Sequence, residues 1–302
     1  MRRDRPAREP YRLREVGLGY LMLAPSLVAF VVFVFYPFAK NFVLPFYSQP
    51  PKFGAIARPE RYVGWSQWKS VLTSDEFRNT LAVTAKFTII TVPIGIVLGL
   101  VLAVAAHQRL RGITVFRTIF SSTVATSIAV VSVIFLSLTN PVVGFFQIRV
   151  GGVSLVENPR WALPSICLVT VWQSLGLSFI VMSAGLQSIP DDLLEAARVD
   201  GAGWFGVFRN VTLPLLSPTL FFAFVVGSIS SFQAFAQVDL LTGGGPDGRT
   251  RTLAYSIYKT SIEAGGPSDA NKAAVIAIGL FVIVLVLTVL QLRLERRVNY
   301  AR

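Results

Sequence analysis

Six long apolar runs, separated by polar loops, divide this chain from one end to the other. Each run has about 20 residues or more, which is the length that an α-helix needs to cross the hydrocarbon core of a bilayer. The loops between them contain proline, glycine and charged residues, which interrupt helices. The pattern predicts an all-α integral membrane protein with six transmembrane helices, at about residues 17–36, 81–106, 118–138, 162–186, 219–238 and 273–292.

The composition supports the membrane class and excludes several kinds of site. Hydrophobic residues fill 53% of the 302 positions and charged residues only 15%, whereas a soluble domain carries about a quarter charged residues. The net charge of +12 would suit nucleic acid, but basic residues also orient membrane proteins, so we expect no nucleic-acid partner. Cys167 and His107 are the only residues of their types. We therefore expect no intramolecular disulfide, no metal site and no catalytic residue.

The distribution of basic residues predicts which side of the membrane holds the chain ends. Six spans place both termini on one side. The segments on that side hold 15 basic residues in 68 positions, including the basic tail 1–16 and the tail 293–302, and the opposite loops hold 12 in 100. Cytoplasmic loops carry the excess of lysine and arginine, so both termini and loop 187–218 are predicted to be cytoplasmic. The first run is too long for a signal peptide and is predicted to remain as a span.

Loop 187–218 is predicted to form a helix, a sharp turn and a second helix. Asp192 lies three residues before Glu195, which is the spacing of a capping box at a helix start. Gly201 and Gly203 follow, where a helix end needs residues that tolerate positive φ. A second amphipathic segment comes after the glycines. These signals predict a compact plug on the cytoplasmic surface.

The stretch from Glu195 to Pro218, EAARVDGAGWFGVFRNVTLPLLSP, resembles the signature loop of the membrane subunits of bacterial binding-protein-dependent ABC importers. It keeps the EAA triplet, the DGA triplet and the later LP and P at the family's spacing. The similarity covers the whole chain and includes LLTGGGP at 240–246, after the fifth run. It implies the type I importer permease fold. It also implies a coupling loop that seats its short helix in a groove of an ATPase subunit, through Glu195, Ala196, Ala197, Asp200, Gly201 and Ala202.

The same resemblance implies the partners of the chain. A second homologous permease, a dimer of ATPase subunits and an extracytoplasmic substrate-binding protein would complete a complex in the bacterial inner membrane. GGGPDGRT at 243–250 is a near match to a phosphate-binding loop, but Arg249 replaces the lysine, so we exclude nucleotide binding there. No cofactor is expected in this chain, and ATP and Mg²⁺ would lie on the partner ATPase. The chain is expected to be a transport subunit and not an enzyme.

Polar residues inside two of the runs predict a solvated path. In the fifth run, small and polar residues recur at helical spacing, at Gly227, Ser230, Ala234 and Gln237. The aromatic residues lie largely on the other side of that helix, at Phe224, Phe232 and Phe235. A polar stripe in hydrocarbon is expected to face a water-filled cavity, although packing through small residues is an alternative. In sugar-importing relatives these parts of the fourth and fifth spans line the substrate site, which implies a path formed by Thr170, Gln173, Ser174, Ser230, Ser231, Gln233 and Gln237.

Lys86 is the one clear charge inside a predicted span. A charge in the membrane interior is a candidate for function, because burying it is costly. Lys86 lies about one turn from the end of its run, so its long side chain also reaches the headgroups. An ion-coupled secondary transporter is less favoured, because no acidic residue lies inside a run.

Within the sugar-importer group, the chain is most similar to glycerol-3-phosphate importer permeases. The similarity lies in LPLLSPTLFF at 213–222, in residues 235–259 and in residues 287–300. It implies glycerol-3-phosphate or a glycerophosphodiester as the transported solute. Phosphate prefers arginine or free backbone N–H groups, and the fourth and fifth runs contain no cation. A neutral disaccharide such as trehalose is therefore the alternative.

Overall fold

The computed structural model describes residues 13–48, 61–107, 112–262 and 267–295. Most of the predicted basic tail 1–16 and of the tail 293–302 lies outside these ranges. Within them, four helices are long and apolar enough to cross a membrane, and two bent helix pairs raise the number to as many as six. The chain is therefore an all-helical membrane protein with four to six candidate spans, as the hydropathy pattern predicts.

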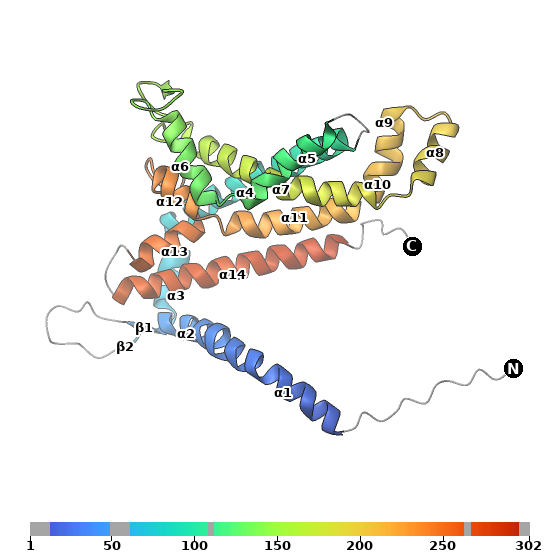
Figure 1. Ribbon diagram of the computed structural model, residues 1–302. Helices are drawn as coiled ribbons and strands as arrows, with labels where there is room; N and C mark the ends of the chain where they lie inside the picture. The colour runs from blue at the N-terminus through green and yellow to red at the C-terminus, as the bar shows by residue number, and fades with distance from the viewer. Residues whose placement is uncertain (1–12, 49–60, 108–111, 263–266, 296–302) are drawn as a thin grey trace.

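The first span stands apart from the rest of the chain. It comprises α1 (Leu13–Phe30), the π-helical turn η1 (Val31–Phe35), α2 (Tyr36–Val43) and the 3₁₀ turn η2 (Leu44–Phe46). It extends past the predicted end at residue 36 to Phe46, so Pro37 does not end the helix. None of its most apolar 18-residue window is buried. Figure 1 shows α1 diverging from the other helices, whereas α2 and η2, at the other end of the span, contact α14.

Short hairpins and a surface helix cover one end of the bundle. Strands β1 (Tyr47–Ser48) and β2 (Arg61–Tyr62) pair antiparallel, as do β3 (Arg149–Val150) and β4 (Val153–Ser154). Helix α3 (Ser66–Leu72) follows β2 and packs Trp68 against α14. α3 corresponds to no predicted span and lies along the surface between the first and second spans.

Helices α4 (Asp75–Ala106) and α7 (Ala162–Gln187) form the central pair, with the most extensive contact between any two helices. α4 begins six residues before its predicted start because Ser74 caps it, accepting a hydrogen bond from the backbone N–H of Phe77 at 3.1 Å. Gly99 lets the two helices approach closely, since a Cβ there would lie 2.5 Å from the Cβ of Ser178.

Two of the predicted spans are broken and not continuous. The third run forms α5 (Ile113–Ser122) with η3 (Thr123–Ala125), and then α6 (Ile128–Thr139), bent by 104°. Ser127 starts the new helix by accepting a hydrogen bond from the backbone N–H of Ala129. The fifth run forms α11 (Ser217–Phe232) and α12 (Ala236–Thr242), separated by residues 233–235. The predicted continuous helices at 118–138 and 219–238 are therefore wrong in this respect.

The signature loop folds into α8 (Asp191–Val199), α9 (Trp204–Val207), η4 (Phe208–Thr212) and α10 (Leu213–Leu215). The predicted helix, turn and helix are present. These elements project from the end of the bundle at which α1 begins and α14 ends (Figure 1). Helices α13 (Leu253–Ile262) and α14 (Pro267–Glu295) complete the chain, and α14 extends beyond the predicted limits 273–292 at both ends.

Candidate functional site

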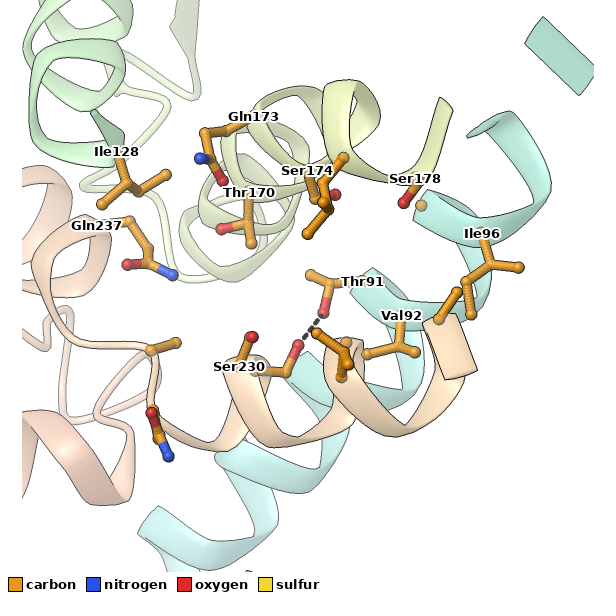
Figure 2. Close-up of a pocket in the computed structure, with 18 of the residues that line it drawn as sticks. Thr91, Val92, Ile96, Ile128, Thr170, Gln173, Ser174, Ser178, Ser230 and Gln237 are labelled. Atoms are coloured by element: carbon orange, nitrogen blue, oxygen red, sulfur yellow. Dashed lines mark hydrogen bonds between the residues drawn. The ribbon is translucent and has the colours of Figure 1, made fainter. Parts of the chain in front are cut away.

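A cavity of about 590 Å³ lies between α4, α7 and α11, beside the breaks in the third and fifth runs. In Figure 2, Thr170, Gln173 and Ser174 of α7 lie on one wall, and Ser230 of α11 faces them. The structure brings together all the residues that the sequence assigns to a substrate path: Thr170, Gln173, Ser174, Ser230, Ser231, Gln233 and Gln237. Their contact with a transported solute stays a prediction.

The cavity is polar without being charged. No residue that lines it is ionisable. Several hydroxyls donate to carbonyls of their own helix, as Thr170 does to Ile166 at 2.8 Å and Ser174 to Val171 at 2.9 Å. Their oxygens keep acceptor capacity. Within the described part of the chain, no protein group hydrogen-bonds the side chains of Gln173, Ser230, Gln233 and Gln237. These side chains are available to a neutral, hydroxylated solute.

The break in the fifth run changes which side chains face the cavity. A continuous helix would place Phe235 largely opposite the polar stripe, whereas the structure places Phe235 among the cavity-lining residues. The reason is that residues 233–235 leave the helix, so the helical spacing no longer fixes their direction. The prediction for Phe235 is therefore wrong, although those for Gln233 and Gln237 agree with the cavity.

Sequence reasoning missed the wall that α4 supplies. Thr91, Val92, Gly95 and Ile96 of this helix line the cavity. Thr91 also joins α4 to α11, since its hydroxyl lies 3.0 Å from that of Ser231 (Figure 2). A signal was present, because threonines and glycines recur along the buried face of α4 at Thr80, Thr84, Thr88, Thr91, Gly95 and Gly99.

Lys86 does not contribute to this cavity. It lies on α4 with its side chain exposed, while its neighbour Phe87 is fully buried. The cavity-lining residues of α4 begin at Thr91. The position agrees with a lysine that reaches outward from the helix.

The signature loop, residues 187–218, is called the coupling loop below. It owes its sharp turn to Gly201. The backbone N–H of Gly201 donates to the carbonyl of Arg198, and that of Ala202 donates to the carbonyl of Ala197, both at 3.0 Å. This pair of bonds with a left-handed residue between them is a Schellman motif. Gly201 has a φ of +85°, as predicted, whereas Gly203 has a φ of −68° and needs no glycine for that reason.

The predicted capping box at the start of α8 does not form. The helix begins at Asp191, with Pro190 at the N-cap and no side-chain cap hydrogen bond. Asp192 therefore lies inside the first turn and cannot act as the cap. Asp191 and Asp192 still favour this helix end, because two carboxylates near a helix N-terminus complement its dipole.

The coupling loop carries exposed apolar side chains and charged side chains that make no ion pair within the described residues. Val199 is 87% exposed, Trp204 68% and Phe205 63%. Within the described residues, the charged side chains of α8 and its C-cap make no ion pair: Asp191, Asp192, Glu195, Arg198 and Asp200. Exposed apolar side chains flanked by unpaired charges are typical of a surface that docks another protein.

The inner face of the loop is tied to the helices that form the cavity. One apolar cluster contains Ile189, which precedes α8, Leu216, which precedes α11, and Met182 of α7. Leu194 of α8 packs against this cluster. A close-packed interior transmits displacement. Movement of α8 would therefore act on the ends of α7 and α11.

Comparisons with known proteins place the chain among transport proteins. Residues 95–300 match the family described as binding-protein-dependent transport system inner membrane component. The chain is 32% identical over 289 residues to the sn-glycerol-3-phosphate transport system permease protein UgpA of Agrobacterium fabrum, covering 94% of this chain and 96% of that protein. It is 32% identical over 294 residues to the trehalose/maltose transport system permease protein MalF of Thermococcus litoralis, with 94% and 96% covered.

Solved structures share the fold. A chain of a bacterial ABC transporter involved in the import of the acidic polysaccharide alginate matches with a TM-score of 0.79 at 22% identity, covering 95% of this chain and 98% of that one. The bacterial alginate ABC transporter in complex with alginate pentasaccharide-bound periplasmic protein matches with a TM-score of 0.78 at 21% identity, covering 94% and 96%. At these identities the likeness concerns the fold alone.

Proposed function

Because this chain belongs to the family of binding-protein-dependent transport system inner membrane components, we propose that it forms one half of the translocation path of an ATP-driven importer. The family makes it a multi-pass permease of the inner membrane and not an enzyme. The observation that carries the proposal is the uncharged cavity of about 590 Å³, which is lined by hydroxyls and by the unpaired side-chain amides of Gln173, Gln233 and Gln237. Polar groups at membrane depth are expected where they line a solute path.

We propose that the coupling loop docks on an ATPase subunit. The exposed apolar residues Val199, Trp204 and Phe205, beside unpaired charges, support this docking. ATP and Mg²⁺ then lie on that partner. This places the coupling loop and both chain ends in the cytoplasm, in agreement with the basic residues on that side. Closure of two ATPases around ATP would move α8, and the apolar cluster around Ile189 would carry this motion to the cavity.

A second homologous permease would complete the path. The cavity is lined by α4, α7, α11 and the adjacent breaks, and no described residue of the first span or of α14 lines it. The first span has no buried residue in its most apolar window, so lipid and a neighbouring permease are its available surroundings. An extracytoplasmic binding protein would deliver the solute at the opposite end from the coupling loop.

We propose glycerol-3-phosphate or a glycerophosphodiester as the solute, supported by the similarity to permeases named for glycerol-3-phosphate. A zwitterionic diester suits the cavity better than a bare phosphate, because no cation lines it. The same neutral lining favours a second candidate, a neutral disaccharide such as trehalose, for which the MalF relative is named.

The test is ATP hydrolysis by the complete complex in lipid, with its binding protein. Hydrolysis is measured with glycerol-3-phosphate, glycerophosphocholine, trehalose and maltose. Stimulation by a glycerophosphate compound alone supports the first candidate, and stimulation by a disaccharide alone supports the second. Uptake that persists after ATP depletion would contradict an ATP-driven importer.

A further inference from the structure

We propose that Thr252 is a positioning residue of the translocation path, because its hydroxyl holds the break in the fifth run in the shape that lines the cavity. Thr252 does not line the cavity itself. It lies immediately before α13, in the segment that follows α12. The proposal rests on the proposed function in one respect, which is that the cavity carries the solute.

The break depends on a hydrogen bond from outside the helix. Residue Ala234 lies between α11 and α12, is only 4% exposed, and its carbonyl has left the regular helical pattern. The hydroxyl of Thr252 donates to that carbonyl at 2.7 Å, and Thr252 is completely buried. At membrane depth water is scarce, so a carbonyl without a donor is costly. Thr252 therefore stabilises the broken form of the span relative to a continuous helix.

Thr252 is in turn held by two neighbours. The hydroxyl of Thr252 accepts from the backbone N–H of Tyr255 at 3.3 Å, as an N-cap residue of α13 does. The backbone N–H of Leu253 donates to the hydroxyl of Thr84 on α4 at 3.0 Å. Thr84 and Leu253 are both fully buried. Two hydrogen bonds, joined by the peptide link between Thr252 and Leu253, thus connect α4 to the break.

The break directs the side chains on either side of Ala234. Gln233, Phe235 and Gln237 all line the cavity. Phe235 packs against two rings of α13, with its centroid 4.5 Å from that of Tyr258 and 6.4 Å from that of Tyr255. The hydrogen bond comes from Thr252, immediately before α13, and the ring contacts come from α13 itself. A shift of this helix would therefore reorient the polar groups offered to the solute.

The first arm of the test measures the shape of the cavity without requiring transport. Ser230→Cys is introduced as a reporter in the assembled complex, and its rate of labelling by N-ethylmaleimide is measured. Cys167, the one native cysteine, is 3% exposed and gives a low background. Thr252→Val is expected to change the labelling rate by about threefold or more, because it removes the donor to a buried carbonyl. Thr252→Ser keeps the hydroxyl and is expected to restore the parental rate.

Two further variants keep this arm decisive. Thr80→Val is the matched control for a change at Thr84. Thr80, like Thr84, is a buried threonine of α4, but its hydroxyl bonds only the carbonyl of Glu76 in its own helix. Thr80→Val is expected to leave labelling unchanged. Thr84→Val removes the acceptor for Leu253 and is expected to change the labelling rate relative to the control Thr80→Val. It carries the test if Thr252→Val does not accumulate. Equal labelling in all variants would overturn the proposal.

The second arm measures the ratio of solute uptake to ATP hydrolysis in proteoliposomes, with glycerophosphocholine and with trehalose. Thr252→Val is expected to lower this ratio by about tenfold, as for one lost buried hydrogen bond, while hydrolysis without solute stays unchanged. If uptake and hydrolysis fall in proportion, the ratio is unchanged, and this outcome would contradict a positioning role. If neither solute is taken up by the parental complex, the proposed function fails, and the labelling arm still decides the role of Thr252.

Discussion

The cavity and the coupling loop are both polar interruptions of an apolar chain, but their polar groups differ in kind. The cavity offers amides and hydroxyls, and no ionisable residue lines it. The helix α8 of the loop offers five exposed charged residues, counting its C-cap, that make no ion pair within the described part of the chain. Neutral groups are tolerated at membrane depth, whereas bare charges need water or an oppositely charged partner. The cavity therefore suits a solute that must be released, and the loop suits a protein surface.

The two regions are connected through apolar packing. The apolar cluster that holds Ile189, Leu216 and Met182 lies between the inner face of the loop and the helices α7 and α11. An apolar, close-packed cluster can transmit a displacement from the loop to these helices. The comparison therefore predicts that damage to the loop and damage to the cavity will impair transport in different ways.

The largest expected effect comes from the turn of the coupling loop. Gly201→Asp should lower ATP-dependent uptake by about 30-fold while membrane insertion stays intact, because a φ of +85° strains any residue with a Cβ. The amount of permease in the membrane is measured beside uptake. Gly203→Ala is the matched control, since Gly203 has a φ of −68° and open space around it, and it should transport normally. Normal coupled uptake in Gly201→Asp would disprove the coupling role.

A smaller effect is expected inside the cavity. Gln173→Leu removes an amide that has no other partner, and uptake should fall by about tenfold, as expected for one hydrogen bond to a solute. ATP hydrolysis without solute should be retained. Trp172→Leu is the neighbouring control, because Trp172 is 47% exposed and does not line the cavity. Equal uptake by Gln173→Leu and the parental protein would show that Gln173 does not contribute to transport of the solute.

A weaker effect is expected on stability from Thr91→Val. This change removes the hydrogen bond between Thr91 and Ser231, and should lower the free energy of unfolding by about 1 kcal/mol. Reaction of buried Cys167 with a thiol-reactive dye during heating measures the unfolding. Thr288→Val should have less effect, since the hydroxyl of Thr288 bonds only the carbonyl of Val284 in its own helix. Identical unfolding of both variants would show that the hydrogen bond between Thr91 and Ser231 contributes no stability.

The smallest effect is expected at Lys86. Its side chain is exposed and lies away from the cavity, so Lys86→Gln should keep uptake within about twofold of the parental rate, as surface substitutions usually do. Uptake is measured at several pH values, because a proton-linked lysine would shift the profile. A large loss of uptake would restore the functional interpretation of this charge.

The sequence predicted the spans, the coupling loop and much of the cavity because each leaves a periodic or local signal. Runs of about 20 apolar residues identify spans. The polar stripe at Ser230 and Gln237 identifies the side of the fifth run that faces the cavity, and Gly201 identifies the turn by its tolerance of positive φ. Each signal depends on residues that are close together in the sequence.

The breaks in the third and fifth runs were not predictable in this way. A hydropathy window averages over the two or three residues at which a helix bends, so 126–127 and 233–235 look as apolar as their surroundings. The break at Ala234 depends on Thr252, which lies 18 residues away. The contribution of α4 was missed for a related reason: its polar residues form a wall of the cavity only once α7 and α11 lie beside them.

The most direct test of the account is whether ATP at the coupling loop changes the cavity. Labelling of Ser230→Cys by a membrane-impermeant thiol reagent is measured from each side of proteoliposomes that contain the complete complex, with and without trapped nucleotide. The account predicts that nucleotide trapping reduces labelling from the side of the coupling loop and increases it from the opposite side, and that Gly201→Asp abolishes this change. Labelling that is the same with and without nucleotide in the parental complex would contradict the coupling of the two regions.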